Sequence, residues 1–145
     1  MEYYFGYTLP QNDLNCEDWR SRNLSWEYCG IALDFFSENK IPFWDMQNAD
    51  ALVGNQNNNN SIYCLAKYLQ TYLIYLPDGG TAQLDLSNSN SVFSVDWFNP
   101  REGGLLIKGS VKEVQGPGKV SIGNPPEDTA KDWVVLIRKK ESSPL

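Results

Sequence analysis

The most informative segment of the chain is Trp133-Val134-Val135-Leu136-Ile137, a continuous run of apolar residues. A short apolar run rich in aromatic and β-branched residues is typical of a strand that is buried on both faces. We therefore expect this segment to be a central strand of a sheet. The sequence before it should then supply the neighbouring strands.

Short strand-like segments precede this run, and turn residues separate them. In Phe93-Ser94-Val95-Asp96-Trp97, apolar and polar residues alternate, as in a strand with one buried face. Pro77-Asp78-Gly79-Gly80 has the composition of a turn. The other strand-like segments are Tyr63–Leu65, Tyr72–Leu76, Ala82–Leu86, Leu105–Ile107, Val111–Val114 and Val120–Ile122. Seven or eight short strands with no helix between them predict a mainly β fold, an antiparallel β-sandwich.

The N-terminal third predicts a helical segment before the sandwich. Between Leu24 and Phe36, apolar residues recur at spacings of three and four, at Trp26, Cys29, Leu33 and Phe36. This spacing is typical of one face of a helix, which Asn39 and Pro42 should end. The face is large for a single helix, so we expect it to pack on a large partner surface. From their apolar surroundings we also expect four tryptophans in a core: Trp19, Trp26, Trp44 and Trp133.

Charge and composition divide the chain into parts. Residues 1–50 contain nine acidic and three basic residues, whereas residues 51–145 contain nine of each, so the net charge of −6 belongs to the first third. The Asn-rich tract over 55–61 follows this boundary and predicts a loop. We therefore divide the chain into an N-terminal part over 1–50, an Asn-rich loop over 51–60 and a β-sandwich module over 61–141.

The composition excludes several classes of function. The chain has no histidine, which excludes Ser-His-Asp and Cys-His catalysis and histidine-ligated metals within it. Cys16, Cys29 and Cys64 form no CxxC pair, so we expect three buried thiols, and we expect neither a metal nor a cofactor. The pI of about 4.6 argues against a nucleic-acid partner. No apolar run reaches the length of a membrane span, so we expect no membrane partner.

The candidate ligand-binding residues, Trp97, Asn99 and Arg101, lie where a predicted strand enters a turn. An exposed indole ring beside hydrogen-bonding side chains can stack on a sugar. In the alternative interpretation, Trp97 fills the sandwich core and Asn99 shapes the turn. The alternation of Trp97 with Phe93 and Val95 favours this alternative, because it points Trp97 inward.

Two pairs of nearby carboxylates, Glu17/Asp18 and Asp45/Asp50, raise the hypothesis of glycoside hydrolysis, which uses two carboxylates. Residues that are close in sequence need not face each other across a cleft. Glu17 and Asp18 also suit the first turn of a helix that Asp13 or Asn15 would cap. We therefore favour structural roles for these carboxylates and predict no catalytic residue in the chain.

The order of several motifs resembles a known architecture. The first motifs are similar to the end of the barrel in glycoside hydrolases with an apiosidase-like catalytic domain: Glu2–Tyr7, Asp13-Leu14, Cys16–Arg22, Ala32–Phe36 and Ile41–Met46. The motifs that follow are similar to the domain appended to these barrels, whose family name is "putative collagen-binding domain of a collagenase": Tyr63–Ala66, Tyr72–Pro77, Leu84–Leu86, Trp97–Arg101 and Asp132–Val135.

This resemblance implies that the chain is a C-terminal fragment and that Met1 is an internal or misassigned start. Tyr3–Tyr7 would be the last barrel strand and Leu24–Phe36 the last barrel helix, whose apolar face would pack on the rest of the barrel. Catalytic residues of such barrels lie at the ends of several strands, so those of the parent would lie outside this chain. Export to the periplasm or the medium fits a polysaccharide-degrading parent, and the compartment stays open.

Three functions follow as hypotheses. The first is a non-catalytic accessory module of a glycoside hydrolase that packs on the catalytic barrel and contacts polysaccharide. The second is a module that binds collagen or another protein, and the third is a small enzyme with two facing carboxylates. Exposed aromatic residues around the N-terminal helix would favour domain docking, whereas a distal aromatic patch would favour a ligand. Under the first hypothesis, the isolated chain should also self-associate through this helix.

Overall fold

The structure, a computed structural model, describes residues 23–55 and 60–141. These residues form one α-helix, α1 (Asn23–Glu38), followed by eight strands in two antiparallel sheets. The strands are β1 (Gln47–Asn48), β2 (Tyr63–Lys67), β3 (Thr71–Leu76), β4 (Gln83–Asp85), β5 (Val92–Phe98), β6 (Glu113–Gln115), β7 (Lys119–Ser121) and β8 (Trp133–Lys139). Two short 3₁₀ helices flank β1, η3 (Phe43–Asp45) and η4 (Asp50–Val53). The predicted mainly β fold with an N-terminal helix is confirmed.

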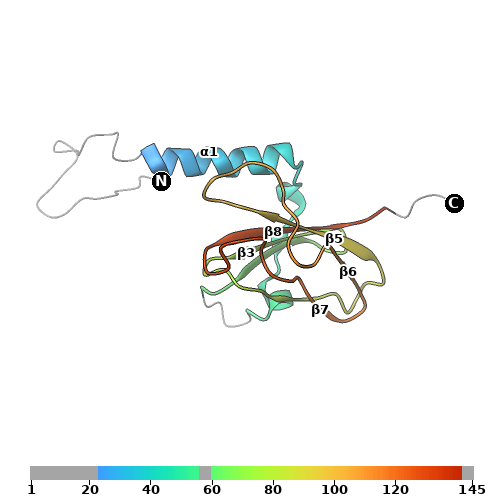
Figure 1. Cartoon of the computed structure of the whole chain (residues 1–145). Coiled ribbons are helices and arrows are strands. Elements are labelled where there is room, and N and C mark those ends of the chain that lie inside the picture. Colours follow the sequence, from blue (N-terminus) through green and yellow to red (C-terminus); the bar gives the residue numbers. More distant parts are fainter. Residues whose placement is uncertain (1–22, 56–59, 142–145) are drawn as a thin grey trace, which may run out of the picture.

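The larger sheet has six strands in the order β1-β2-β3-β8-β5-β6, and the smaller sheet pairs β4 with β7. β8 lies between β3 and β5, so Val135 is opposite both Ile74 and Trp97. This confirms the predicted central strand. Figure 1 shows α1 on one side of the six-stranded sheet and β7 on the other side.

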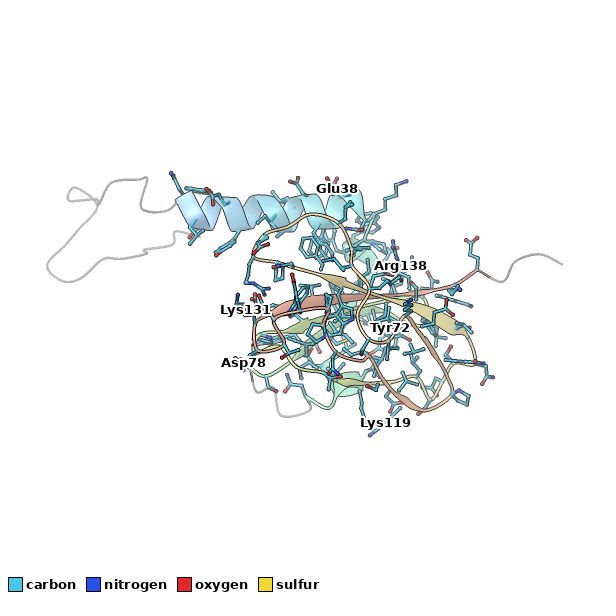
Figure 2. All side chains as sticks on the ribbon, in the orientation of Figure 1. Glu38, Tyr72, Asp78, Lys119, Lys131 and Arg138 are labelled. Atoms are coloured by element: carbon cyan, nitrogen blue, oxygen red, sulfur yellow. The ribbon has the colours of Figure 1, made fainter. Side chains whose placement is uncertain are left out.

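Both faces of the six-stranded sheet are covered, which explains why the first five residues of β8, Trp133–Ile137, are all apolar. Trp133, Val135 and Ile137 belong to the core between the two sheets, together with Leu84 and Ile122. The alternate residues of β8 belong to a second cluster beneath α1, as Figure 2 illustrates for the crowded space between the sheet and the end of α1 at Glu38. Tyr72 lies on the sandwich side, buried among side chains of the main core.

The helix contacts the sheet mainly through its C-terminal half. Phe35 is buried, and its ring centroid lies 4.2 Å from that of Phe98 at the end of β5. Asn39 ends the helix as predicted, because its Nδ2 donates to the Phe35 carbonyl at 2.9 Å. Arg138 of β8 donates from Nη1 to the Asn39 carbonyl at 3.3 Å and so ties the end of α1 to the sheet.

The predicted apolar face of this helix lies largely in solvent, and a different side of the helix contacts the sheet. Trp26 and Leu33 are 66% and 72% exposed, and Cys29 is also exposed. The side that contacts the sheet instead carries Phe35 and the partly buried Ile31. α1 has apolar residues around most of its circumference, so three- and four-residue spacings fit more than one face.

Other predictions have mixed outcomes. Trp133 and Cys64 are buried as expected, but Trp44 is 72% exposed. The predicted strand at Leu105–Ile107 is an extended loop that makes a single bridge, between Ile107 and Trp97. The predictions for Tyr3–Tyr7, Asp13, Asn15, Cys16, Glu17, Asp18 and Trp19 lie outside the described residues. None of the described helices is long and apolar enough to cross a membrane.

Candidate functional site: a groove between α1 and the sheet

A groove of about 760 Å³ lies between α1 and the outer face of the six-stranded sheet. The helix contributes Tyr28, Ile31, Ala32, Phe35 and Phe36 to its lining. The sheet contributes Tyr63, Leu65, Leu73, Tyr75, Phe98 and Val134, and the turn after β5 contributes Pro100 and Arg101. The lining is mostly apolar, with a few polar groups at its ends, which is typical of ligand sites.

Two tyrosines form part of the sheet side of this groove. Tyr63 of β2 and Tyr75 of β3 are directly opposite each other in the antiparallel register. Their rings are nearly parallel, at 19°, and their centroids are 6.3 Å apart. The Tyr63 hydroxyl is 2.6 Å from Asn60 Oδ1, and the Tyr75 hydroxyl is 3.4 Å from Asp132 Oδ2. The cross-strand register and these hydrogen bonds fix the position of both rings.

An ion pair adjoins the Tyr75 ring. Arg101 Nη1 lies 2.7 Å from Asp132 Oδ1 and also donates to the Asp132 backbone carbonyl. The guanidinium carbon lies 5.3 Å from the centroid of the Trp133 ring. The two charged side chains are 21% and 27% exposed, so both can be reached from solvent. Arg101 Nη2 has no hydrogen-bond partner among the described residues.

The hydroxyl of Tyr75 stays protonated at neutral pH. Burial raises its pKa above the usual value, and the charge of Asp132 and the hydrogen bond to it raise the pKa further. A protonated phenol donates to the carboxylate, so Tyr75, Asp132 and Arg101 form one hydrogen-bonded row. This row presents donors and acceptors beside an aromatic surface.

The structure separates the three predicted ligand-binding residues. Trp97 is fully buried in the main core. Its ring centroid lies 6.1 Å from that of Trp133, and the two ring planes are at 78° to each other. Asn99 is 5% exposed, and its Oδ1 accepts from the Arg101 amide at 3.1 Å, which shapes the turn. Trp97 therefore offers no ring face to a sugar, and the alternative in which it fills the core describes its position. Arg101 is the one of the three that lines the groove.

Of the two carboxylate pairs singled out in the sequence, the structure describes Asp45 and Asp50, and both bind other protein groups. Asp45 forms an ion pair with Lys67 at 2.9 Å. Asp50 is buried, and its Oδ1 accepts from the Cys64 amide at 2.6 Å, while its Oδ2 accepts from Asn48 at 2.7 Å. Within the described ranges, no three cysteine, aspartate or glutamate side chains gather as a metal site.

The site residues predicted from the sequence did not include Tyr63, Tyr75 or Asp132. Tyr63 and Tyr75 lie in segments that were predicted as strands, and the short connection between these segments is a hairpin signal that could have placed them side by side. Asp132 lies far along the chain from Arg101, and no motif spacing connects them.

Exposed aromatic residues gather on α1 and the connector after it. Trp26 and Tyr28 lie on the helix, and Phe43 and Trp44 lie in η3. The centroid of the Phe43 ring lies 5.8 Å from that of Phe36 and 5.3 Å from that of Trp44. Leu24 and Leu33 of α1 are also exposed. The other exposed large apolar side chains lie at the β2–β3 turn, in β3 and in the loop after β5: Tyr68, Leu69, Tyr75, Leu105 and Ile107.

Comparison with known proteins identifies relatives of this fold. The family model described as "Putative collagen-binding domain of a collagenase" matches residues 48–138. A solved structure named "Glycoside hydrolase" has a TM-score of 0.61 and 13% identity, and the match covers 86% of this chain and 28% of that one. A glycoside hydrolase family 5 structure from Bacteroides vulgatus ATCC 8482 has a TM-score of 0.59 and 15% identity. This match covers 79% of this chain and 24% of that chain. The chain thus spans about a quarter of each hydrolase, and it matches no curated protein sequence.

Proposed function

Because the chain belongs to the family described as "Putative collagen-binding domain of a collagenase", we propose that it is a non-catalytic accessory module of a glycoside hydrolase. In this proposal, the module packs on the catalytic domain through α1 and the connector that follows it. The similarity to segments of two glycoside hydrolase chains supports the association with such enzymes.

The proposal rests on the exposed apolar side chains of α1 and of the connector after it. Trp26 and Leu33 are seven residues apart and therefore lie on one side of α1, and both are largely exposed. Trp44 is 72% exposed at the end of the same segment. Soluble domains rarely leave such apolar surface in water unless another surface covers it.

A module that binds collagen or another protein is the second candidate, and the family description favours it. It would need an aromatic surface away from α1. The exposed apolar residues there, such as Tyr68 and Leu105, lie on separate loops rather than on one strand face. This arrangement favours docking through α1 over a distal protein site.

Sedimentation velocity of the isolated chain tests the docking proposal. We expect reversible self-association that the double variant Trp26→Glu/Leu33→Glu suppresses, because two charges would interrupt the apolar side of α1. Tyr68→Glu is the matched control, because Tyr68 is exposed but lies on the β2–β3 turn. A wild-type chain that stays monomeric and binds no hydrophobic dye would contradict the proposal, as would equal suppression by both variants.

A further inference from the structure

We propose that the groove beneath α1 binds a neutral oligosaccharide, with the Tyr75 ring as the stacking surface and the Arg101–Asp132 pair as the hydrogen-bonding end. The choice of a glycan as ligand rests on the proposed function, since an accessory module of a glycoside hydrolase works beside polysaccharide. The geometry of the groove carries the rest.

The aromatic surface comes from two strands rather than a loop. Tyr75 is 37% exposed, and the neighbouring Tyr63 ring lies nearly parallel to it. The apolar face of a pyranose ring packs against such rings and leaves its hydroxyls at the edge. Because the cross-strand register holds both tyrosines, little conformational freedom is lost when a sugar binds.

The polar end suits a neutral ligand. Asp132 neutralises Arg101 at 2.7 Å, so the pair carries no net charge. The two side chains nevertheless present N–H donors and carboxylate acceptors within one small region. Vicinal sugar hydroxyls both donate and accept hydrogen bonds, so they match this combination. An anionic sugar would gain little, because the guanidinium already has its counterion.

The same groups disfavour a proline-rich peptide, which also stacks on aromatic rings. Proline has no amide N–H, so such a peptide presents mainly carbonyl acceptors. The Asp132 carboxylate would then lose water without gaining a donor, which costs free energy. The groove of about 760 Å³ also falls in the ordinary range of small-ligand sites.

The test uses isothermal titration calorimetry of the whole chain with cellohexaose, xylohexaose and mannohexaose, and with a triple-helical peptide of Pro-Hyp-Gly repeats. We expect at least one hexasaccharide to bind, and Tyr75→Ala to weaken that binding about tenfold, equivalent to about 1.4 kcal/mol. Tyr75→Phe keeps the ring and should retain most of the affinity. Tyr68→Ala should leave the affinity unchanged, because Tyr68 lies outside the groove lining.

Three outcomes would overturn the inference. They are the absence of binding to every hexasaccharide, binding that Tyr75→Ala leaves intact, and binding of the Pro-Hyp-Gly peptide in place of a sugar with the same dependence on Tyr75. Thermal unfolding of each variant verifies that it is folded. Docking through Trp26 and Leu33 is measured separately by sedimentation, so either proposal can fail without the other.

Discussion

Arg101 Nη1 lies 2.7 Å from Asp132 Oδ1, and this ion pair joins the turn after β5 to the residue that precedes β8. The two strands are neighbours, and their last pair in this direction is Phe98 with Val134. Strand pairing therefore brings the two charged residues together although they are 31 positions apart. The Arg101 side chain in turn covers the Trp133 ring, so one residue links the groove to the main core.

Loss of this ion pair should lower stability measurably. We expect Arg101→Ala to reduce the free energy of unfolding by about 1–2 kcal/mol, because it leaves a mostly buried Asp132 carboxylate without its cation. Lys131→Ala is the control, because Lys131 pairs with Asp128 where both side chains are at least half exposed. Its effect should be clearly smaller in the same urea titration, because solvent screens an exposed ion pair. Equal effects of both variants would contradict the role of burial.

Trp97 should matter for stability and not for binding. Truncation to alanine leaves a cavity in a fully buried site beside Trp133, so we expect a loss of about 3–5 kcal/mol in the free energy of unfolding. Trp44→Ala should cost less than about 0.5 kcal/mol, since that ring is exposed in the isolated chain. Urea denaturation followed by circular dichroism compares the two variants, and similar losses would be inconsistent with the burial of Trp97.

The two described cysteines should differ in reactivity. Burial, and then the charge of Asp50, raise the pKa of Cys64 to about 12, so its thiolate is scarce at pH 8. Cys29 is exposed on α1. In a Cys16→Ser background, we expect iodoacetamide to modify Cys29 in the native chain and both cysteines in urea. Mass spectrometry reads the result, and rapid native labelling of Cys64 would contradict its burial.

Stability should fall at alkaline pH. The folded state keeps the Cys64 proton to about pH 12, whereas the unfolded chain releases it near pH 9. The unfolded state then binds fewer protons, so the free energy of unfolding decreases as pH rises, by about 1.4 kcal/mol per unit over this interval. The raised pKa values of Tyr72 and Tyr75 act in the same direction at higher pH. Cys64→Val should flatten the decline that begins near pH 9, and an unchanged profile would rule out the thiol as its source.

Sequence patterning predicts the sheet well but leaves open which side of α1 contacts it, for one physical reason. A strand has two faces, so the alternation in Phe93–Trp97 leaves little choice about which side chains enter the core. In α1, Ile31, Leu33 and Phe35 all belong to an apolar series, and a rotation of the helix exchanges which of them is covered. The sheet beneath decides the rotation, and it does so through Phe98 and Leu136.

The groove could not be predicted from the sequence, because its residues come together only when the strands pair and α1 packs on the sheet. Tyr63 and Tyr75 become neighbours through the β2–β3 register, and Asp132 reaches them from the start of the last strand. Arg101 alone was identified, since it follows a strand at a turn. The hairpin signal between β2 and β3 could have paired Tyr63 with Tyr75, but no local spacing links this pair to Asp132 or Arg101.

The placement of β8 has a consequence for biosynthesis. β8 is the last of the eight strands to be translated, yet it alone joins the unit β1-β2-β3 to the unit β5-β6. Until residues 133–139 leave the ribosome, β3 and β5 each present an open edge with unpaired backbone groups. Nascent chains that lack β8 therefore expose strand edges that favour pairing between molecules, and the six-stranded sheet is completed only after residues 133–139 have emerged.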